Sequence, residues 1–403
     1  MIGLLRRIST RRLLALCAAV AGVVVGGAAL AMATTGGGPE PKPAALPVAV
    51  HDALTAPQVQ GVSGRIRFTN HLINNSDVQG GSPLLSGASG RFWAASDGQL
   101  RLELQADASA DRGTSDTQVL ADRKRVSVYD SGTDTVYEAA LPKGHERTSS
   151  DASANEQPPS LAQVKKGIAQ LMEHASVSGA DPTNVAGQPA YSVRLEPQQN
   201  GGLIGGAELA WDAVHGTPLR AGVYAKGDSS PVVELKVTKI SYGQVPSSVF
   251  EISPSADAKV VDLSPSAGDS GAHGDSPAVT GLDQVQQHVS FPVTAPDAAA
   301  GLPRSGVRLV QNGKDAGALV TYGHGLDGIA VLEWPAERNS SSTGPGGDQG
   351  QLTLPTVSVD GIQGEELETP LGTMVRFQRA GVGYTVIGSV PGSTALAAAR
   401  DLH

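Results

Sequence analysis

Two serine-containing turns are the residues whose type and spacing come nearest to a nucleophile. "GDSG" spans residues 268–271 and "GDSS" spans residues 227–230. A reactive serine needs a rigid strand–turn–helix mount such as the G-x-S-x-G elbow, and that pattern does not occur in the sequence. The first turn lies in a stretch rich in Ser, Gly and Asp, and the second lies in an expected hairpin turn. We therefore assign neither Ser229 nor Ser270 to catalysis.

The histidines and the acidic cluster indicate neither metal binding nor acid–base chemistry. The 9 histidines form no H-E-x-x-H pair, and no two lie three or four residues apart on an expected helix, so no metal site is predicted. Glu365, Glu366 and Glu368 are close in sequence, but successive residues of a strand face opposite sides. Nothing supplies a nucleophile, a base and an oxyanion donor together. The sequence predicts neither an enzyme nor a bound cofactor.

The N-terminal residues 1–33 carry an export signature. An uncharged apolar run over residues 13–33 ends in Ala31-Met32-Ala33, a small-x-small cleavage pattern, and it follows four arginines, Arg6, Arg7, Arg11 and Arg12. The run is also close to the ~20 residues that span a bilayer. Two interpretations remain open: a cleaved signal peptide, or a membrane anchor that is retained. Both place the rest of the chain outside the cytoplasm, secreted or anchored.

Composition restricts the function of the exported part. Without the four N-terminal arginines, 26 of the 30 basic residues remain against 39 acidic residues, a net charge of −13. This balance excludes the basic footprint of a nucleic-acid-binding protein. The single cysteine, Cys17, lies in the apolar run, so no disulfide is expected. Fifty glycines and 26 prolines favour short strands and many turns.

Two domains are expected, separated by polar stretches. Residues 34–47 are rich in Pro and Gly and predict a flexible tether, and residues 256–279 predict a linker. The first domain spans residues 48–255. The second, a smaller α+β module, spans residues 280–403 and ends in an expected helix at 393–402.

The first domain alternates apolar and polar residues over many short stretches. In "VAGQPAYSVRLEP", residues 185–197, the apolar side chains alternate with Ser192, Arg194 and Glu196, which is typical of a strand with one buried face. Two helices are expected, near 48–56 and over 160–173, the second with Ser160 as its cap. One antiparallel sheet with two amphipathic helices has no second sheet, so the helices must cover its apolar face.

Several stretches of this domain resemble the LolA/RseB-like lipoprotein carriers of actinobacterial type, also called outer-membrane lipoprotein-sorting proteins. The best of them are "GQPAYSVRLEP" at 187–197 and "GTPLR" at 216–220, within residues 48–255. The C-terminal part weakly resembles a DUF4367-like domain, through "GLDQVQQHVSFPVTAP" and "YTVIGSVPGSTALAAARDL". The resemblance implies an α+β fold: a curved, antiparallel half-barrel with a helical lid over a hydrophobic cavity.

The resemblance also implies the function and the residues that carry it. The protein would be a non-enzymatic carrier that binds lipid or lipoprotein acyl chains outside the membrane. The alternative is an RseB-like regulator that binds a membrane protein of the anti-sigma type. The candidates for the cavity are Ile66, Phe68, Leu102, Leu104, Val128, Tyr191, Val193, Leu195, Trp211, Val223, Leu235 and Val237. The lid candidates are Leu161, Val164, Ile168 and Leu171. The sequence leaves open whether these side chains line a cavity or fill an ordinary core.

Overall fold

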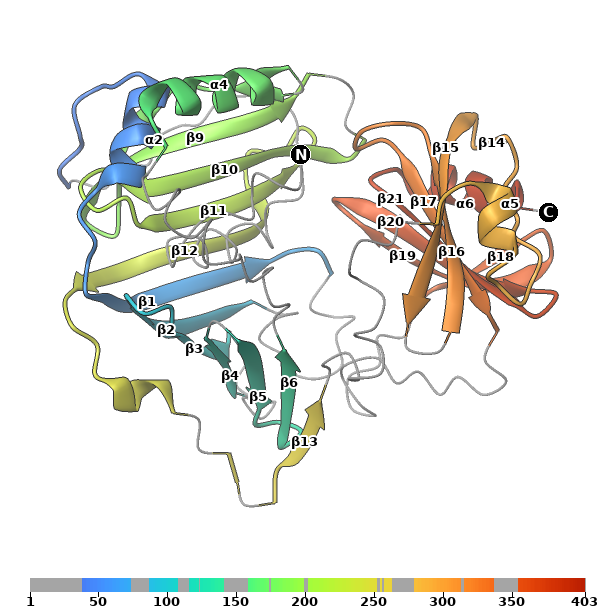
Figure 1. The fold of residues 1–403 in the computed structure, drawn as a ribbon, viewed down its shortest axis with the longest axis horizontal. Helices are drawn as coiled ribbons and strands as arrows, with labels where there is room; N and C mark the ends of the chain where they lie inside the picture. The colour runs from blue at the N-terminus through green and yellow to red at the C-terminus, as the bar shows by residue number, and fades with distance from the viewer. Residues whose placement is uncertain are drawn as a thin grey trace, which may run out of the picture. The chain divides into compact units, whose positions relative to one another are not determined.

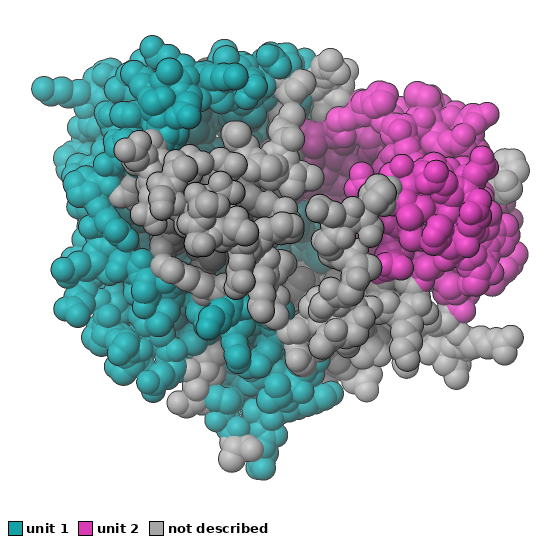
Figure 2. Space-filling view, viewed as in Figure 1, with its two compact units in different colours: residues 1–199, 205–264 teal, residues 200–204, 265–403 magenta. Residues whose placement is uncertain are grey.

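The chain divides into two compact units (Figure 2). Unit 1 comprises residues 1–199 and 205–264, and unit 2 comprises residues 200–204 and 265–403. The computed structural model describes residues 38–73, 87–107, 116–122, 124–140, 159–173, 175–198, 202–251, 254–255, 257–262, 279–312, 315–336 and 354–402. The expected export segment, residues 1–33, lies outside the described residues. No helix within the described ranges has both the length and the apolarity needed to cross a membrane.

Unit 1 is an α+β half-barrel whose 13-stranded sheet curls along its length (Figure 1). The strand order is β13-β6-β5-β4-β3-β2-β1-β12-β11-β10-β9-β7, and β8 pairs with β9. The predicted fold class is therefore confirmed. The strands are β1 (Gly61–Asn70), β2 (Ala88–Ala95), β3 (Leu100–Ala106), β4 (Asp116–Ala121), β5 (Arg125–Asp130), β6 (Thr135–Ala140), β7 (Ala175–Val177), β8 (Asp181–Val185), β9 (Gln188–Pro197), β10 (Ile204–Asp212), β11 (Pro218–Ala225), β12 (Pro231–Tyr242) and β13 (Lys259–Asp262).

Strand β13 differs from the expected linker at 256–279. It pairs with β6 in parallel, with Val260 opposite Val136. Two consecutive valines favour a strand, and β6 offers an edge with unpaired backbone groups. Residues 263–278 of the expected linker lie outside the described residues.

The stretch at 185–197 forms the predicted strand, and it is entered through a tight hairpin. Ala186 and Gly187 have φ values of 55° and 79°, the left-handed geometry of a two-residue turn whose twist matches that of the flanking strands. The strand β9 that follows ends at Pro197.

Two helices lie at the β7–β9 end of this sheet, α2 (Leu46–Thr55) and α4 (Leu161–Met172) (Figure 1). Helix α4 begins as predicted: the Ser160 hydroxyl accepts from the backbone N–H of Gln163, whose side chain accepts from the N–H of Ser160 at 2.8 Å. This capping box satisfies two backbone donors that have no partner within the helix. A 3₁₀ turn, η2 (Ser247–Phe250), follows β12.

The expected tether at 34–47 is corrected in its described part. Residues 39–44 lie against β8 and β9, and Leu46 already belongs to α2. The Asn184 side chain donates to the carbonyl of Pro39 at 2.9 Å, and the Tyr191 hydroxyl donates to the carbonyl of Lys42 at 2.6 Å. An extended Pro-rich segment has few internal hydrogen bonds, so its carbonyls are free to accept from side chains of the sheet.

Unit 2 is a smaller α+β module, as predicted, on an 8-stranded sheet of order β14-β15-β16-β17-β21-β20-β19-β18. Residues of helix α6 such as Ala395 and Ala398 are fully buried against the core valines of this sheet. The elements are α5 (Leu282–Gln286), β14 (Ala298–Ala299), β15 (Leu302–Asn312), β16 (Asp315–Tyr322), β17 (Ile329–Pro335), β18 (Thr356–Val359), β19 (Ile362–Thr369), β20 (Gly372–Arg379), β21 (Val382–Gly388) and α6 (Gly392–Arg400).

Candidate functional site

Cross-strand register joins eight of the twelve cavity candidates into one face of the unit 1 sheet, which we call the apolar face. Cross-strand register places Phe68 opposite Leu235, and Ile66 opposite Val237. Leu102 lies opposite Val119 of β4, which in turn lies opposite Val128 of β5. The candidates on this face are Ile66, Phe68, Leu102, Leu104, Val128, Val223, Leu235 and Val237.

The apolar face combines buried side chains with partly exposed ones. Ile66, Leu104 and Val237 are 5%, 5% and 7% exposed, and they belong to one hydrophobic cluster. Phe68, Leu102 and Leu235 pack against that cluster but are only partly buried. Among the described residues, every member of this cluster comes from a strand or from a loop next to one, and none comes from a helix.

Tyr191, Val193 and Trp211 belong to a separate cluster. They pack with Ala49 of α2 and with Ala180, and the rings of Tyr191 and Trp211 lie 6.1 Å apart. The fourth candidate of β9 and β10, Leu195, pairs with Ala207 and Val177. The apolar side chains of "AYSVRL" therefore lie in a core that α2 covers, apart from the eight candidates of the apolar face.

Helix α4 is placed beside α2 and β7 (Figure 1). Of the four lid candidates, Val164 is buried, Leu161 and Ile168 are partly buried, and Leu171 is exposed. None of them belongs to the hydrophobic cluster of the apolar face. The helical stripe is present as predicted, but it lies at the β7 edge.

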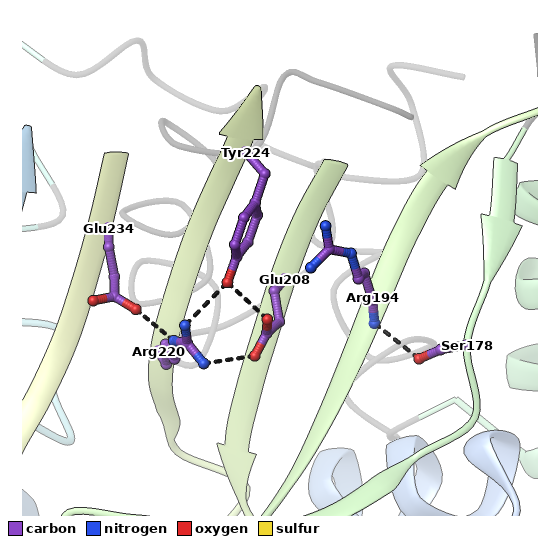
Figure 3. Close-up of polar contacts among 6 residues, drawn as sticks. All are labelled: Ser178, Arg194, Glu208, Arg220, Tyr224 and Glu234. Carbon is purple, nitrogen blue, oxygen red and sulfur yellow. Dashed lines mark hydrogen bonds and ion pairs between the residues drawn. The ribbon is translucent and has the colours of Figure 1, made fainter. Parts of the chain in front are cut away.

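A charged network on the other side of strands β9–β12 was missed by the sequence reasoning (Figure 3). Arg220 donates to Glu208 at 2.8 Å, to Glu234 at 2.5 Å and to the Tyr224 hydroxyl at 3.0 Å. Tyr224 in turn donates to Glu208 at 2.8 Å, and the Arg194 guanidinium lies 4.3 Å from the centre of its ring. Burial, together with the Glu208 carboxylate, raises the pKa of the Tyr224 hydroxyl above its usual value. The network joins four neighbouring strands.

Alternating charged residues gave a signal for this network, but only a partial one. Arg194 and Glu234 each sit between apolar neighbours, which predicted a solvent-facing side. Burial of the Glu208 side chain to 12% exposure could not be read from that alternation. The burial of Glu208 depends on its ion pair with Arg220 of the neighbouring strand β11.

The buried carboxylate Asp212 closes the turn between β10 and β11. It accepts from the Tyr242 hydroxyl at 2.5 Å and from the backbone N–H groups of Val214 and His215 at 2.7 and 2.9 Å. The His215 ring stacks on Tyr242, with ring centres 3.8 Å apart. The neighbouring cavity measures about 60 Å³, against the roughly 300–1,000 Å³ of ligand pockets. These contacts fix the hairpin.

Three of the residues considered for catalysis, Ser229, Glu365 and Glu368, are exposed in the structure. Ser229 is exposed in the β11–β12 turn, and Ser270 lies outside the described residues. Glu368 accepts from the backbone N–H of Gly392 at 3.3 Å at the start of α6, while Glu365 lies opposite Arg376. Within the described ranges, no group of three or more His, Cys, Asp or Glu side chains could hold a metal ion.

Comparison with models of known protein families and with curated protein sequences finds no match. Among solved structures, MucB in complex with MucA is 16% identical and has a TM-score of 0.40, covering 88% of this chain and 96% of that chain. The MucA/MucB complex of Pseudomonas aeruginosa is 17% identical, with a TM-score of 0.40 and coverage of 87% and 95%. A LolA superfamily protein from Nitrosomonas europaea is 11% identical, with a TM-score of 0.20 and coverage of 52% and 98%. None of these comparisons supports the DUF4367-like resemblance or an actinobacterial type.

Proposed function

We propose that this protein is a non-enzymatic, extracytoplasmic binding protein that holds acyl chains of lipids or lipoproteins against the apolar face of unit 1. The observation that carries this proposal is that Phe68, Leu102 and Leu235 are partly exposed and pack against a buried apolar cluster. No helix residue belongs to the described cluster there. Partly exposed apolar side chains that lie together on one face favour a hydrophobic ligand or partner.

The free energy of transferring an acyl chain out of a membrane favours an enclosed binding site over a loose surface contact. Removing an acyl chain of ~15 methylenes from a membrane costs roughly 12 kcal/mol, at about 0.8 kcal/mol for each methylene. The small residues Ala88, Ala94 and Ala106 lie on the same face of the sheet, in register with Phe68 and Leu100. All three are buried, so these small residues belong to the buried part of this face.

Truncating Phe68 should weaken acyl binding. Phe68→Ala removes part of the apolar surface that a chain would contact, so a fluorescent fatty-acid probe should bind about tenfold more weakly, equivalent to roughly 1.4 kcal/mol. Leu102→Ala is a second variant with the same expected direction. Binding is measured by titration of the probe into the full chain, with thermal unfolding to verify that each variant is folded.

Ile387→Ala is the matched control, because Ile387 is a 45% exposed apolar residue of unit 2. It should bind the probe like the unmodified protein. Equal affinity in Phe68→Ala, Leu102→Ala and Ile387→Ala would contradict the proposed location. If neither the unmodified protein nor these variants bind the probe, the result would contradict the proposed acyl-binding function.

The alternative function, regulation through a membrane-protein partner, is favoured by a row of apolar residues on unit 2. Ala330, Ile387, Met374 and Leu367 lie directly opposite one another across β17, β21, β20 and β19. Core residues such as Val331 and Val386 point to the other side of the sheet. A cross-linker at Ile387 that captures a membrane protein in intact cells, together with a negative acyl-probe result, would favour this alternative.

A further inference from the structure

The face of the unit 1 sheet opposite the apolar face carries positive charges in direct cross-strand register. Lys239 lies opposite Arg65, which lies opposite Arg91, so that three cations cross β12, β1 and β2 in one row. Beside this row, Lys236 lies opposite Arg67. Like charges directly opposite each other in a sheet are destabilising, so this arrangement is unfavourable in the absence of an anion.

The cations are only partly neutralised by neighbours. Arg67 pairs with Asp107 at 3.2 Å, and Arg91 pairs with Glu103 at 2.9 Å. Within the described part of the chain, the side chains of Arg65, Lys236 and Lys239 have no ion pair or hydrogen bond. The whole chain has a net charge of −9, so this concentration of unpaired cations departs from the charge of the molecule.

A β-bulge in β12 shapes the same place. Between β1 and β12 the register shifts at Arg65 and Ile66, leaving Thr238 as the extra residue beside Lys239. A bulge bends its strand and re-aims the neighbouring side chains. Both Thr238 and Lys239 are exposed.

A cavity of about 770 Å³ lies over these strands. Its lining includes two parallel rows of residues from the sheet face opposite the apolar face. One row is Arg65, Arg91, Glu103 and Gln118, and the other is Arg67, Ser89, Gln105 and Asp116. The volume is within the range of small-molecule sites. One end is cationic at β1 and β2, and the other carries Glu103 and Asp116, of which Glu103 is already paired with Arg91 and Arg101.

We propose that this cavity binds a phosphoryl group at its cationic end, at a site separate from the acyl site. A guanidinium matches the geometry of phosphate oxygens. Of the arginines that line the cavity, Arg65 is the one without a carboxylate partner among the described residues. Thr238 offers a hydroxyl donor to the remaining oxygens, whereas the Ser89 hydroxyl already donates to Asp107 at 2.8 Å. Gln105 and Gln118 offer amide groups to a polar substituent of the phosphate. The phosphoryl group can come from a free phosphate or from a phosphodiester headgroup.

The test is isothermal titration of the full chain with two probes that contain no acyl chain: inorganic phosphate and glycerophosphoglycerol. The titrations are done near physiological ionic strength, where exposed charges are screened beyond ~8 Å. Arg65→Gln should raise the Kd at least tenfold, and Lys239→Gln several-fold. Arg376→Gln removes the same charge from an exposed position of unit 2 and should leave the Kd unchanged.

Binding of inorganic phosphate that is lost in Arg65→Gln would support the site with a free phosphate as its ligand. Binding of glycerophosphoglycerol alone, lost in the same variant, would support the site with a headgroup as its ligand. The proposal is overturned if neither probe binds, if Arg65→Gln binds like the unmodified protein, or if Arg376→Gln weakens binding as much as Arg65→Gln.

Discussion

Replacing Arg220 with alanine should lower the free energy of unfolding of unit 1 by about 3 kcal/mol, because it leaves two carboxylates without their shared cation. Glu208 and Glu234 are only 12% and 15% exposed, and both accept from Arg220. Removing one partner of a partly buried ion pair costs more than the pair contributes, since the remaining charge stays desolvated. Hydrogen exchange of the β11 and β12 amides measures the loss within unit 1.

Two further variants separate this effect from a general loss of positive charge. Arg67→Ala breaks the exposed pair with Asp107, whose side chains are 60% and 36% exposed, and should cost less than about 1 kcal/mol. Arg220→Lys keeps the charge but loses the planar fork, so its cost should fall between the two. Equal stability of Arg220→Ala and Arg67→Ala would show that the network of Figure 3 does not stabilise the sheet.

Unit 2 should lose about 3 kcal/mol of stability as the pH rises from 4.5 to above 7, owing to Glu333. Its side chain is fully buried, one oxygen accepts from the N–H of Thr294 at 2.9 Å, and the other has no partner among the described residues. Burial raises its pKa from 4.5 to about 7. The folded state therefore holds the proton more tightly than the unfolded state, so the stabilisation is complete below pH 4.5 and is lost as the pH rises through 7.

Glu333→Gln should remove this pH dependence, because the amide keeps an acceptor for Thr294 and does not ionise. The measurement is the free energy of unfolding of unit 2 between pH 4.5 and 8, followed by hydrogen exchange of β16 and β17. Glu365→Gln, at an exposed position of β19, is the matched control and should keep the slope. An unchanged slope in Glu333→Gln would contradict a charge buried at this position.

Local patterns predicted the elements of this fold well. The alternation in "AYSVRLEP" gave strand β9, and Ser160 followed by Gln163 gave the start of α4. Strands with one apolar side and two helices predicted a single antiparallel sheet covered by helices, and the family resemblance added that this sheet is a half-barrel. These features are set by residues near each other in sequence, so they can be read without the tertiary structure.

Contacts between residues that are far apart in sequence could not be predicted from local patterns. Alternation assigns Tyr191 and Phe68 each to an apolar side of its own strand, but it does not show that α2 covers one and not the other. The cross-strand row of Lys239, Arg65 and Arg91 unites residues that are far apart in sequence. The docking of residues 39–44 likewise depends on side chains of β8 and β9.

Native mass spectrometry of the full chain, purified from the organism that makes it, tests acyl binding at the apolar face most directly. We expect a discrete added mass that organic extraction removes and identifies as a lipid, and a much smaller bound fraction in Phe68→Ala than in Ile387→Ala. A mass equal to that of the polypeptide alone, unchanged by added fatty acid or phospholipid, would show that the apolar face is a filled core and not a binding site.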